Sequence, residues 1–212
     1  MRLGALKVHS FDYDPQSVAC TEELKRRYCA GAANWTIEQG SVLDPSYLSR
    51  QGQFDVVYSW GVLHHTGDMW QALANVIPLL SQGGTLFIAL YNDEGLQSRL
   101  WSKVKRTYSR WPLTRPFLVL AFCPYWLVKG LIVDVVFLRK NPLARYGRSH
   151  QARGMTYFTD LLDWLGGYPF EVARLGEILA FYRKNGFELV NLRAAGRGHG
   201  NNEYVFVKRQ GG

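Results

Sequence analysis

An acidic residue at the end of an apolar segment is the first feature of this sequence that could take part in chemistry. LKVHSFDY, residues 6–13, is typical of a β-strand, and Asp12 lies near its carboxyl end. Asp14 and Pro15 follow, an N-cap residue and a proline at the favoured first helical position. A carboxylate at this end of a strand in an open α/β sheet can accept hydrogen bonds from two vicinal hydroxyls. Asp12 is therefore a candidate for ribose binding; a surface acid that merely closes the strand is the alternative.

Two adjacent histidines are the second candidate. His64 and His65 follow FDVVYSWG at 54–61, whose apolar run predicts a strand covered on both faces. Neighbouring helical residues point in different directions, and no acidic or Cys partner stands at ligand spacing, so no metal site is expected. A neutral imidazole here could take a proton from a substrate hydroxyl near pH 7. A capping or partly buried histidine is the alternative.

An alternation of strands and helices must position these residues. After the first strand, the patterns predict a helix at 15–29, strands at 35–42 and 54–61, a helix at about 68–80 and a strand at 83–92. Such alternation predicts an α/β fold with a doubly wound parallel sheet. Near the C-terminus, a helix at 175–187 is ended by Gly186. The connection between the last two strands, 188–196 and 201–209, is too short for a parallel crossover and requires an antiparallel hairpin.

Four segments together resemble a known family. FDYDPQSV, EQGSVLD, FDVVYSWGVLHHTGD and LLSQGGTLFIALYN look like the successive motifs of class I S-adenosylmethionine-dependent methyltransferases, most of all the bacterial ubiquinone-biosynthesis-type methylases. The resemblance implies a Rossmann-like fold, S-adenosyl-L-methionine as the cofactor, and methyl transfer to a small, hydrophobic molecule through an O, C or N acceptor. A non-catalytic remnant that serves as a binding or membrane-associated module is the alternative. A nicotinamide-dependent dehydrogenase is disfavoured, because no hydride-transfer constellation is found.

The resemblance also implies roles for individual residues. Asp12 matches the acid that binds the ribose hydroxyls, and Tyr13 packs either on the adenine or in the core. Ser41 stands where relatives usually carry an acid for the adenine amino group, and Asp44 is a substitute acceptor. The expected site comprises Asp12, Tyr13, Ser41, Val42, Ser59, Trp60 and Gly61 for the cofactor, His64 and His65 for catalysis, and Tyr91 and Asn92 for the substrate.

The family's first strand and its GxGxG-type turn are not recognised in the sequence. RLGA, residues 2–5, looks like the last turn of the helix that follows this turn, with Gly4 as its C-terminal stop. GRGHG, residues 196–200, leads into a strand, whereas a phosphate cradle needs a helix N-terminus. We therefore expect a core that lacks its first strand and a chain that is a poor enzyme alone. An internal start site, a truncated gene or a shortened expression product would each explain it.

The excess positive charge lies in one internal segment. The net charge is +8; residues 95–165 carry 12 Lys/Arg and 3 Asp/Glu, and the remainder carries 13 and 14. The apolar stretch 117–138 is long enough to span a bilayer, but Lys129 near its middle would cost about 2.5–3.5 kcal/mol there. With Pro124 breaking the helix, we expect a helical hairpin. It would be a lid over a hydrophobic substrate or a peripheral membrane contact through 96–140. No nucleic-acid-binding module is recognised.

The expected organisation is a core at 1–94, a basic helical insert or lid at 95–172, and a C-terminal helix and hairpin at 173–212 that complete the core. The three cysteines show no CxxC spacing, which suits a reduced protein without a disulfide framework or zinc site. No signal-peptide pattern is found, so we expect a cytoplasmic protein, membrane-peripheral if the insert binds lipid.

Overall fold

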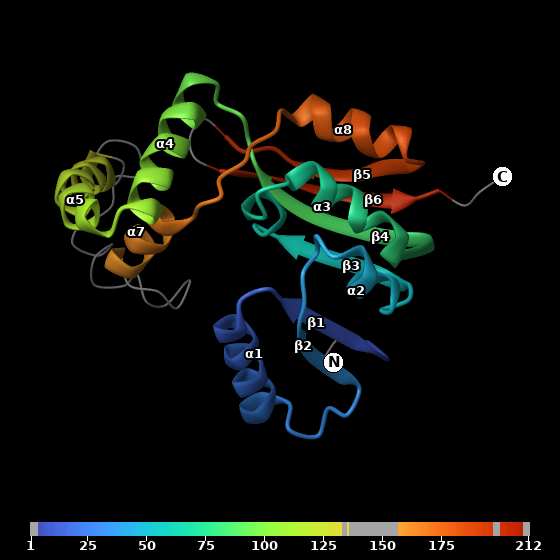
Figure 1. Cartoon of the computed structure of the whole chain (residues 1–212). Helices are drawn as coiled ribbons and strands as arrows, with labels where there is room; N and C mark the ends of the chain where they lie inside the picture. Colours follow the sequence, from blue (N-terminus) through green and yellow to red (C-terminus); the bar gives the residue numbers. More distant parts are fainter. Residues whose placement is uncertain (1–3, 133–134, 136–156, 197–199, 210–212) are drawn as a thin grey trace. The chain divides into compact units, whose positions relative to one another are not determined.

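The computed structural model describes residues 4–132, 135, 157–196 and 200–209 (Figure 1). The chain divides into two compact units. Unit 1 comprises residues 1–92 together with 173–212, and unit 2 comprises residues 93–172. Each unit has its own helices.

A two-stranded parallel sheet begins unit 1. It pairs β1 (Val8–Asp12) with β2 (Trp35–Gln39), and α1 (Pro15–Tyr28) connects the two strands. The carboxylate of Asp14 accepts hydrogen bonds from the backbone N–H groups of Gln16 and Ser17, which confirms the predicted N-cap. β2 ends three residues earlier than the sequence pattern indicated, at Gln39.

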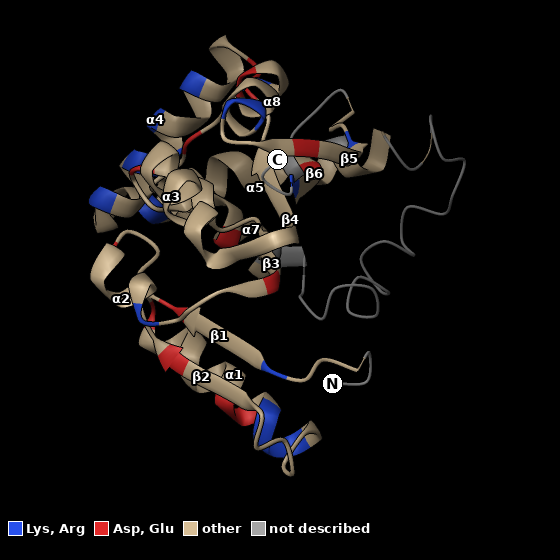
Figure 2. Cartoon of the chain, turned by 90° about the vertical axis from the view of Figure 1, so that its right-hand side faces the viewer, with Lys and Arg blue, Asp and Glu red and all other residues tan. Residues whose placement is uncertain are grey.

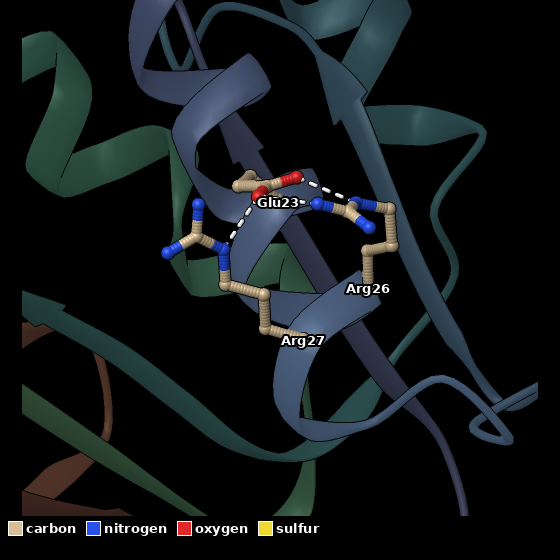
Figure 3. A network of polar contacts seen from close by, with 3 residues as sticks. All are labelled: Glu23, Arg26 and Arg27. Carbon is tan, nitrogen blue, oxygen red and sulfur yellow. Dashed lines mark hydrogen bonds and ion pairs between the residues drawn. The ribbon is translucent and has the colours of Figure 1, made fainter.

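Helix α1 is a surface helix that buries none of its residues. Its polar face carries a small network in which Glu23 accepts hydrogen bonds from Arg26, at 2.6 and 2.7 Å, and from Arg27 (Figure 3). These bonds lower the pKa of the Glu23 carboxyl. All three side chains lie at the surface, so the network contributes little to the stability of the fold.

A four-stranded sheet forms the rest of unit 1. The strand order is β3-β4-β6-β5, with β3 at Phe54–Trp60, β4 at Leu80–Tyr91, β5 at Phe187–Arg193 and β6 at Asn201–Lys208. β3 and β4 are parallel, and β6 runs antiparallel to both of its neighbours. The mixed α/β fold with a closing antiparallel hairpin is thus confirmed. The parallel strands do not form one continuous sheet, however, because β1–β2 and β3–β4 belong to separate sheets.

One face of the four-stranded sheet carries the main core. Helices α3 (Met69–Asn75) and α8 (Leu175–Lys184) contribute Leu73, Ile178 and Tyr182, which cluster with Leu86, Ile88 and Phe206 of the strands. Figure 1 shows both helices over the same face. The hydroxyl of Tyr182 donates a hydrogen bond to the carbonyl of Leu73, so the two helices are also linked directly.

The other face of β3 is open, and the expectation that both faces of this strand are covered is wrong. Val56 is 63% exposed and Tyr58 is 64% exposed. The side chains of alternate residues point to opposite faces, and both helices of the core pack on the same one. Within the described part of unit 1, no helix packs on the face that carries Val56 and Tyr58.

The connections in unit 1 differ in detail from the sequence expectations. The polar stretch between β2 and β3 contains a short helix, α2 (Pro45–Ser49), which the sequence analysis did not predict. A single helix was predicted at about 68–80, and the structure has α3 followed by the 3-10 turn η2 (Ile77–Leu79). The α-helix does not continue because Pro78 lacks the backbone N–H that an α-helical hydrogen bond needs. Gly186 has φ +80°, the left-handed conformation that ends α8 as predicted.

Unit 2 is helical. Its described elements are α4 (Leu96–Arg110), η3 (Pro112–Thr114), α5 (Arg115–Ile132) and α7 (Tyr157–Gly166). Helix α5 continues through Pro124, so the expected break is wrong; a proline removes one backbone hydrogen bond, and the turns on both sides persist. The second arm of the expected hairpin lies outside the described residues.

Candidate active site

The carboxyl end of β1 carries the acid singled out from the sequence. The Oδ1 atom of Asp12 accepts a hydrogen bond from the backbone N–H of Asp14 at 2.9 Å, and its backbone carbonyl accepts from Gly40 at 3.0 Å. The turn therefore fixes the carboxylate through one oxygen. Tyr13 follows with 77% of its surface exposed, so a core role for this ring is wrong.

The residues after β2 are engaged in local turns. The hydroxyl of Ser41 accepts a hydrogen bond from the N–H of Leu43 at 3.1 Å, and the carbonyl of Val42 accepts from the Asn75 side chain at 2.8 Å. Asp44 is the N-cap of α2 and accepts from two backbone N–H groups through Oδ1. Because that oxygen satisfies the helix end, the structure favours a capping role for Asp44 over its interpretation as a substitute adenine acceptor.

At the carboxyl end of β3, Ser59 is followed by Trp60 and Gly61. The indole N–H of Trp60 donates to the Glu203 carboxylate at 3.4 Å, and the ring is 39% exposed. Gly61 has φ +77°, so the chain turns away from the strand in a conformation that a residue with a side chain rarely adopts. The amide of Asn201 lies beside this turn, 3.9 Å from where a Cβ of residue 61 would stand.

The 3-10 turn η1 (Leu63–His65) brings both histidines against the end of β4. The ring of His64 lies 4.2 Å from that of Tyr91 and 4.4 Å from that of His65, measured between centroids. His64 has no exposed surface, whereas His65 is partly exposed. The burial of His64 agrees with the structural alternative, and it leaves His65 as the histidine that solvent can reach.

Asn92, directly after β4, takes part in a polar chain that sequence reasoning missed. Its side-chain oxygen accepts a hydrogen bond from Asn202 at 3.0 Å, and the Asn202 oxygen accepts from the N–H of Ala195 at 2.8 Å. Asn202 is 2% exposed, so this chain ties the end of β4 to the hairpin. Two consecutive asparagines at the start of a predicted strand were the signal that could have revealed it. On the same face of β6, burial raises the pKa of Tyr204 to about 12.

The predicted site residues thus form two groups within unit 1. One group lies at the carboxyl end of the β3–β4 pair and comprises Trp60, Gly61, the two histidines, Tyr91 and Asn92. Asp12, Tyr13 and Ser41 lie at the corresponding end of the β1–β2 pair. The described residues contain no cluster of three or more His, Cys, Asp or Glu side chains that could hold a metal ion.

Comparison with known proteins gives this arrangement a context. Residues 2–86 match the family model described as a methyltransferase domain. A search of curated proteins found no relative with significant sequence similarity.

Several solved structures share the fold. PKMT2 from Rickettsia typhi in complex with AdoHcy is 14% identical with a TM-score of 0.57; the match covers 94% of this chain and 44% of that one. Magnesium protoporphyrin IX methyltransferase from Synechocystis PCC 6803, with bound SAH, is 13% identical with a TM-score of 0.52 and coverages of 98% and 66%. A putative methyltransferase from Bacillus halodurans C-125 is 10% identical with a TM-score of 0.53 and coverages of 96% and 83%.

The chain thus spans less than half the length of PKMT2, and identities this low establish a common fold alone. The family model matches the part of the chain that contains β1, β2, β3 and the first part of β4. Residues 2–86 are therefore similar to a methyltransferase domain, and the chain shares a Rossmann-like fold with these solved methyltransferase structures.

Proposed function

We propose that the chain takes part in methyl transfer from S-adenosylmethionine to a small, apolar acceptor. The observation that carries the proposal is the position of Asp12. It is an acid at the carboxyl end of a parallel strand, inside the segment that matches the methyltransferase-domain model. Ligands of open α/β sheets bind at this end of the strands.

The residues at these strand ends fit the cofactor's polar groups. S-adenosylmethionine supplies a methyl group on a sulfonium, which leaves as a neutral thioether. Asp12 would hold the ribose hydroxyls through Oδ2, because Oδ1 is engaged by the turn. Tyr13 has most of its ring exposed and could stack on the adenine. Ser41 and Val42, directly after β2, would border the same ring.

A buried polar atom supports the binding of a ligand at the group of residues around the carboxyl end of the β3–β4 pair. The Oδ1 atom of Asn201 is buried and has no hydrogen-bond partner among the described residues. It belongs to the amide that lies beside Gly61, at the carboxyl end of β3. A buried acceptor without a donor is costly, so we infer that this oxygen accepts a hydrogen bond from the ammonium end of the cofactor. Ser59 and Trp60 would border the same end.

The acceptor would lie near Tyr91 and Asn92. Methyl transfer depends mostly on holding the two reacting atoms in line, and it needs a base only when the acceptor is protonated. For a hydroxyl acceptor, His65 is the candidate base, because it is partly exposed and His64 is fully buried. His64 would then position His65 and Tyr91 through its ring contacts. The partly exposed indole of Trp60 suits an apolar acceptor.

The division of the sheet supports a further part of the proposal. The Nζ atom of Lys7, just before β1, lies 5.7 Å from the ring centre of Phe54, the first residue of β3, and the ring centre of His9 in β1 lies 6.1 Å from it. The two strands do not pair, and each has one edge without a partner among the described strands. We propose that an additional parallel strand, from beyond the residues described, pairs between them and completes the cofactor site. The chain without it would bind the cofactor weakly.

Binding of S-adenosylhomocysteine tests the cofactor site. NMR titration into the millimolar range detects weak binding, and Asp12→Asn is the informative variant because an amide oxygen can still accept from the N–H of Asp14. Loss of a hydrogen bond to a charged group should weaken binding by about 10- to 150-fold, from about 1.5 to 3 kcal/mol. Glu22→Gln, which neutralises an exposed acid on α1, is the control and should leave affinity unchanged.

The outcomes separate the parts of the proposal. Equal affinity of the Asp12 variant and the wild type would remove Asp12 from the site. Tight binding by residues 1–212 alone would contradict the additional strand while leaving methyl transfer in place. If the protein binds the ligand but transfers no methyl group to any of a panel of apolar alcohols, amines and activated carbon acids, the chain is a binding module.

A further inference from the structure

An exposed apolar stripe runs along η3 and α5 in unit 2. Leu113 is 87% exposed, Phe117 72% and Leu120 74%. The opposite side of the helix packs inside the unit, where the ring of Phe122 lies 5.1 Å from that of Trp101. Spacings of four and three residues mark a single helical face. Exposed residues at spacings of four, three, seven (two turns) and four form the stripe: Leu113, Phe117, Leu120, Leu127 and Leu131.

A basic stripe runs along the neighbouring helix, α4. The stripe consists of exposed basic residues at spacings of four, three and four: Arg99, Lys103, Arg106 and Arg110. Helix α4 contains no acidic residue, and Figure 2 shows its basic residues in blue. A one-sided row of exposed cations on a helix that contains no acidic residue is suited to an anionic surface.

The two stripes meet where α4 ends. Arg110 is the last residue of α4, and its guanidinium carbon lies 5.9 Å from the centre of the Trp111 ring. Trp111 is 59% exposed and is followed two residues later by Leu113, the first residue of the apolar stripe. Basic, aromatic and aliphatic side chains therefore adjoin at one corner. This is the composition found at the boundary between lipid headgroups and acyl chains.

The stripe favours a helix that lies on a membrane over one that crosses it. Among the described helices, Pro112–Ile132 is long and apolar enough to span a bilayer, and only 6% of its apolar window is buried, unlike the core helix of a soluble protein. Its sequence includes Lys129, a charge that is costly at the centre of a bilayer. In an interfacial position the apolar stripe enters the membrane while charged side chains keep their contact with water.

We propose that α4, η3 and α5 form an interfacial element that binds unit 2 to an anionic lipid bilayer. The aliphatic and aromatic side chains of the α5 stripe enter the boundary of the acyl chains. The α4 stripe contacts the lipid phosphates and carboxylates. Binding is peripheral, and it depends on both the apolar surface and the negative charge of the membrane. The inference rests on unit 2 alone and is independent of the proposed methyl transfer.

Vesicle co-sedimentation of the whole chain tests this surface. Phosphatidylcholine vesicles with roughly 30% phosphatidylserine should bind the protein, and vesicles of phosphatidylcholine alone should bind it far less. Each basic residue near the surface is expected to contribute about fivefold to the partition coefficient, so Arg106→Gln with Arg110→Gln should reduce binding by about 30-fold. Leu113→Ser with Phe117→Ser removes the exposed apolar contacts and should reduce binding by at least about tenfold.

A matched control separates surface charge from total charge. Arg183→Gln with Lys184→Gln removes two exposed cations from α8 in unit 1 and should bind like the wild type. An equal loss in both charge variants, or binding unaffected by the serine variant, would overturn the proposal. So would dimerisation through the stripe in sedimentation without vesicle binding, which would assign it to a second copy. High salt or carbonate is expected to release the protein from cell membranes. If only detergent released it, α5 would be a transmembrane helix and the proposal would be wrong.

Discussion

Lys105 provides a prediction whose size follows from the structure. It lies on α4 with no exposed surface, and its Nζ donates a hydrogen bond to the carbonyl of Trp164 in the last turn of α7. Nζ also lies 4.3 Å from the ring centre of Trp164 and 5.2 Å from that of Phe170. Burial lowers the pKa of Lys105 from 10.5 to about 8, and the charge of Asp163 opposes part of this effect.

The sign of the pH dependence follows from this lowered pKa. Between pH 8 and 10.5 the unfolded chain binds more protons at this lysine than the folded chain does. The free energy of unfolding therefore rises with pH across this window. At pH 7 the buried charge destabilises the fold; at about 1.4 kcal/mol per pH unit, the difference between 10.5 and about 8 corresponds to roughly 3 kcal/mol.

Lys105→Met tests this argument, because it keeps the length of the side chain and removes the charge. Removing the buried charge should stabilise the fold by roughly 3 kcal/mol. The Trp164 carbonyl loses its hydrogen-bond donor, which should cost about 1 kcal/mol. We expect unit 2 of the variant to be about 2 kcal/mol more stable at pH 7. The advantage should vanish near pH 10, and the wild type should be the more stable protein above that pH.

Hydrogen exchange of the α4 and α7 amides, together with urea unfolding followed by tryptophan fluorescence, measures the effect at several pH values. Lys103→Met changes an exposed lysine on the same helix and should show no such crossover. A Lys105 pKa above 10 by NMR, or a variant that is less stable at pH 7, would refute the reasoning. Either result would mean that the two aromatic rings and the carbonyl stabilise the ammonium by more than its burial costs.

Two smaller predictions concern unit 1. Asp14→Ala removes the N-cap of α1 and should lower the free energy of unfolding by about 1 kcal/mol in urea titrations, whereas Asp14→Ser should retain most of it. Gly40→Ala places a methyl group into the ring of Tyr47, which packs against Phe11; we expect a loss of at least about 2 kcal/mol and faster hydrogen exchange in β1 and β2. Unchanged exchange rates would mean that the Tyr47 ring shifts without cost.

Much of the fold could be predicted because local signals and packing agree along most of unit 1. The Asp14–Pro15 pair and Gly186 each specify an element end that the structure confirms. Helix α2 was missed although Asp44–Pro45 repeats the signal of Asp14–Pro15. It has only five residues, too few to show helical periodicity.

The site was harder to predict, because burial depends on partners that are distant in sequence. His64 and His65 are neighbours of the same residue type, yet only His64 is fully buried, although both rings lie near Tyr91, at centroid distances of 4.2 and 5.6 Å. Asn202 lies 110 positions from Asn92, and nothing in either local sequence pairs them. The apolar run of β3 indicated a strand but could not indicate which of its faces the helices cover.

The uneven distribution of the core in unit 1 has a consequence for local opening. Among the described residues, the cluster around the four-stranded sheet contains 15 buried residues, whereas only Tyr47, Leu48 and Leu79 are buried in the cluster that includes Phe11 of β1. Helix α1 buries none. The β1–α1–β2 segment should therefore unfold locally at a lower free energy than the rest of the unit and be the first part of it that a protease cuts. Because Asp12 lies on this segment, a ligand bound there would slow that cleavage in proportion to its occupancy.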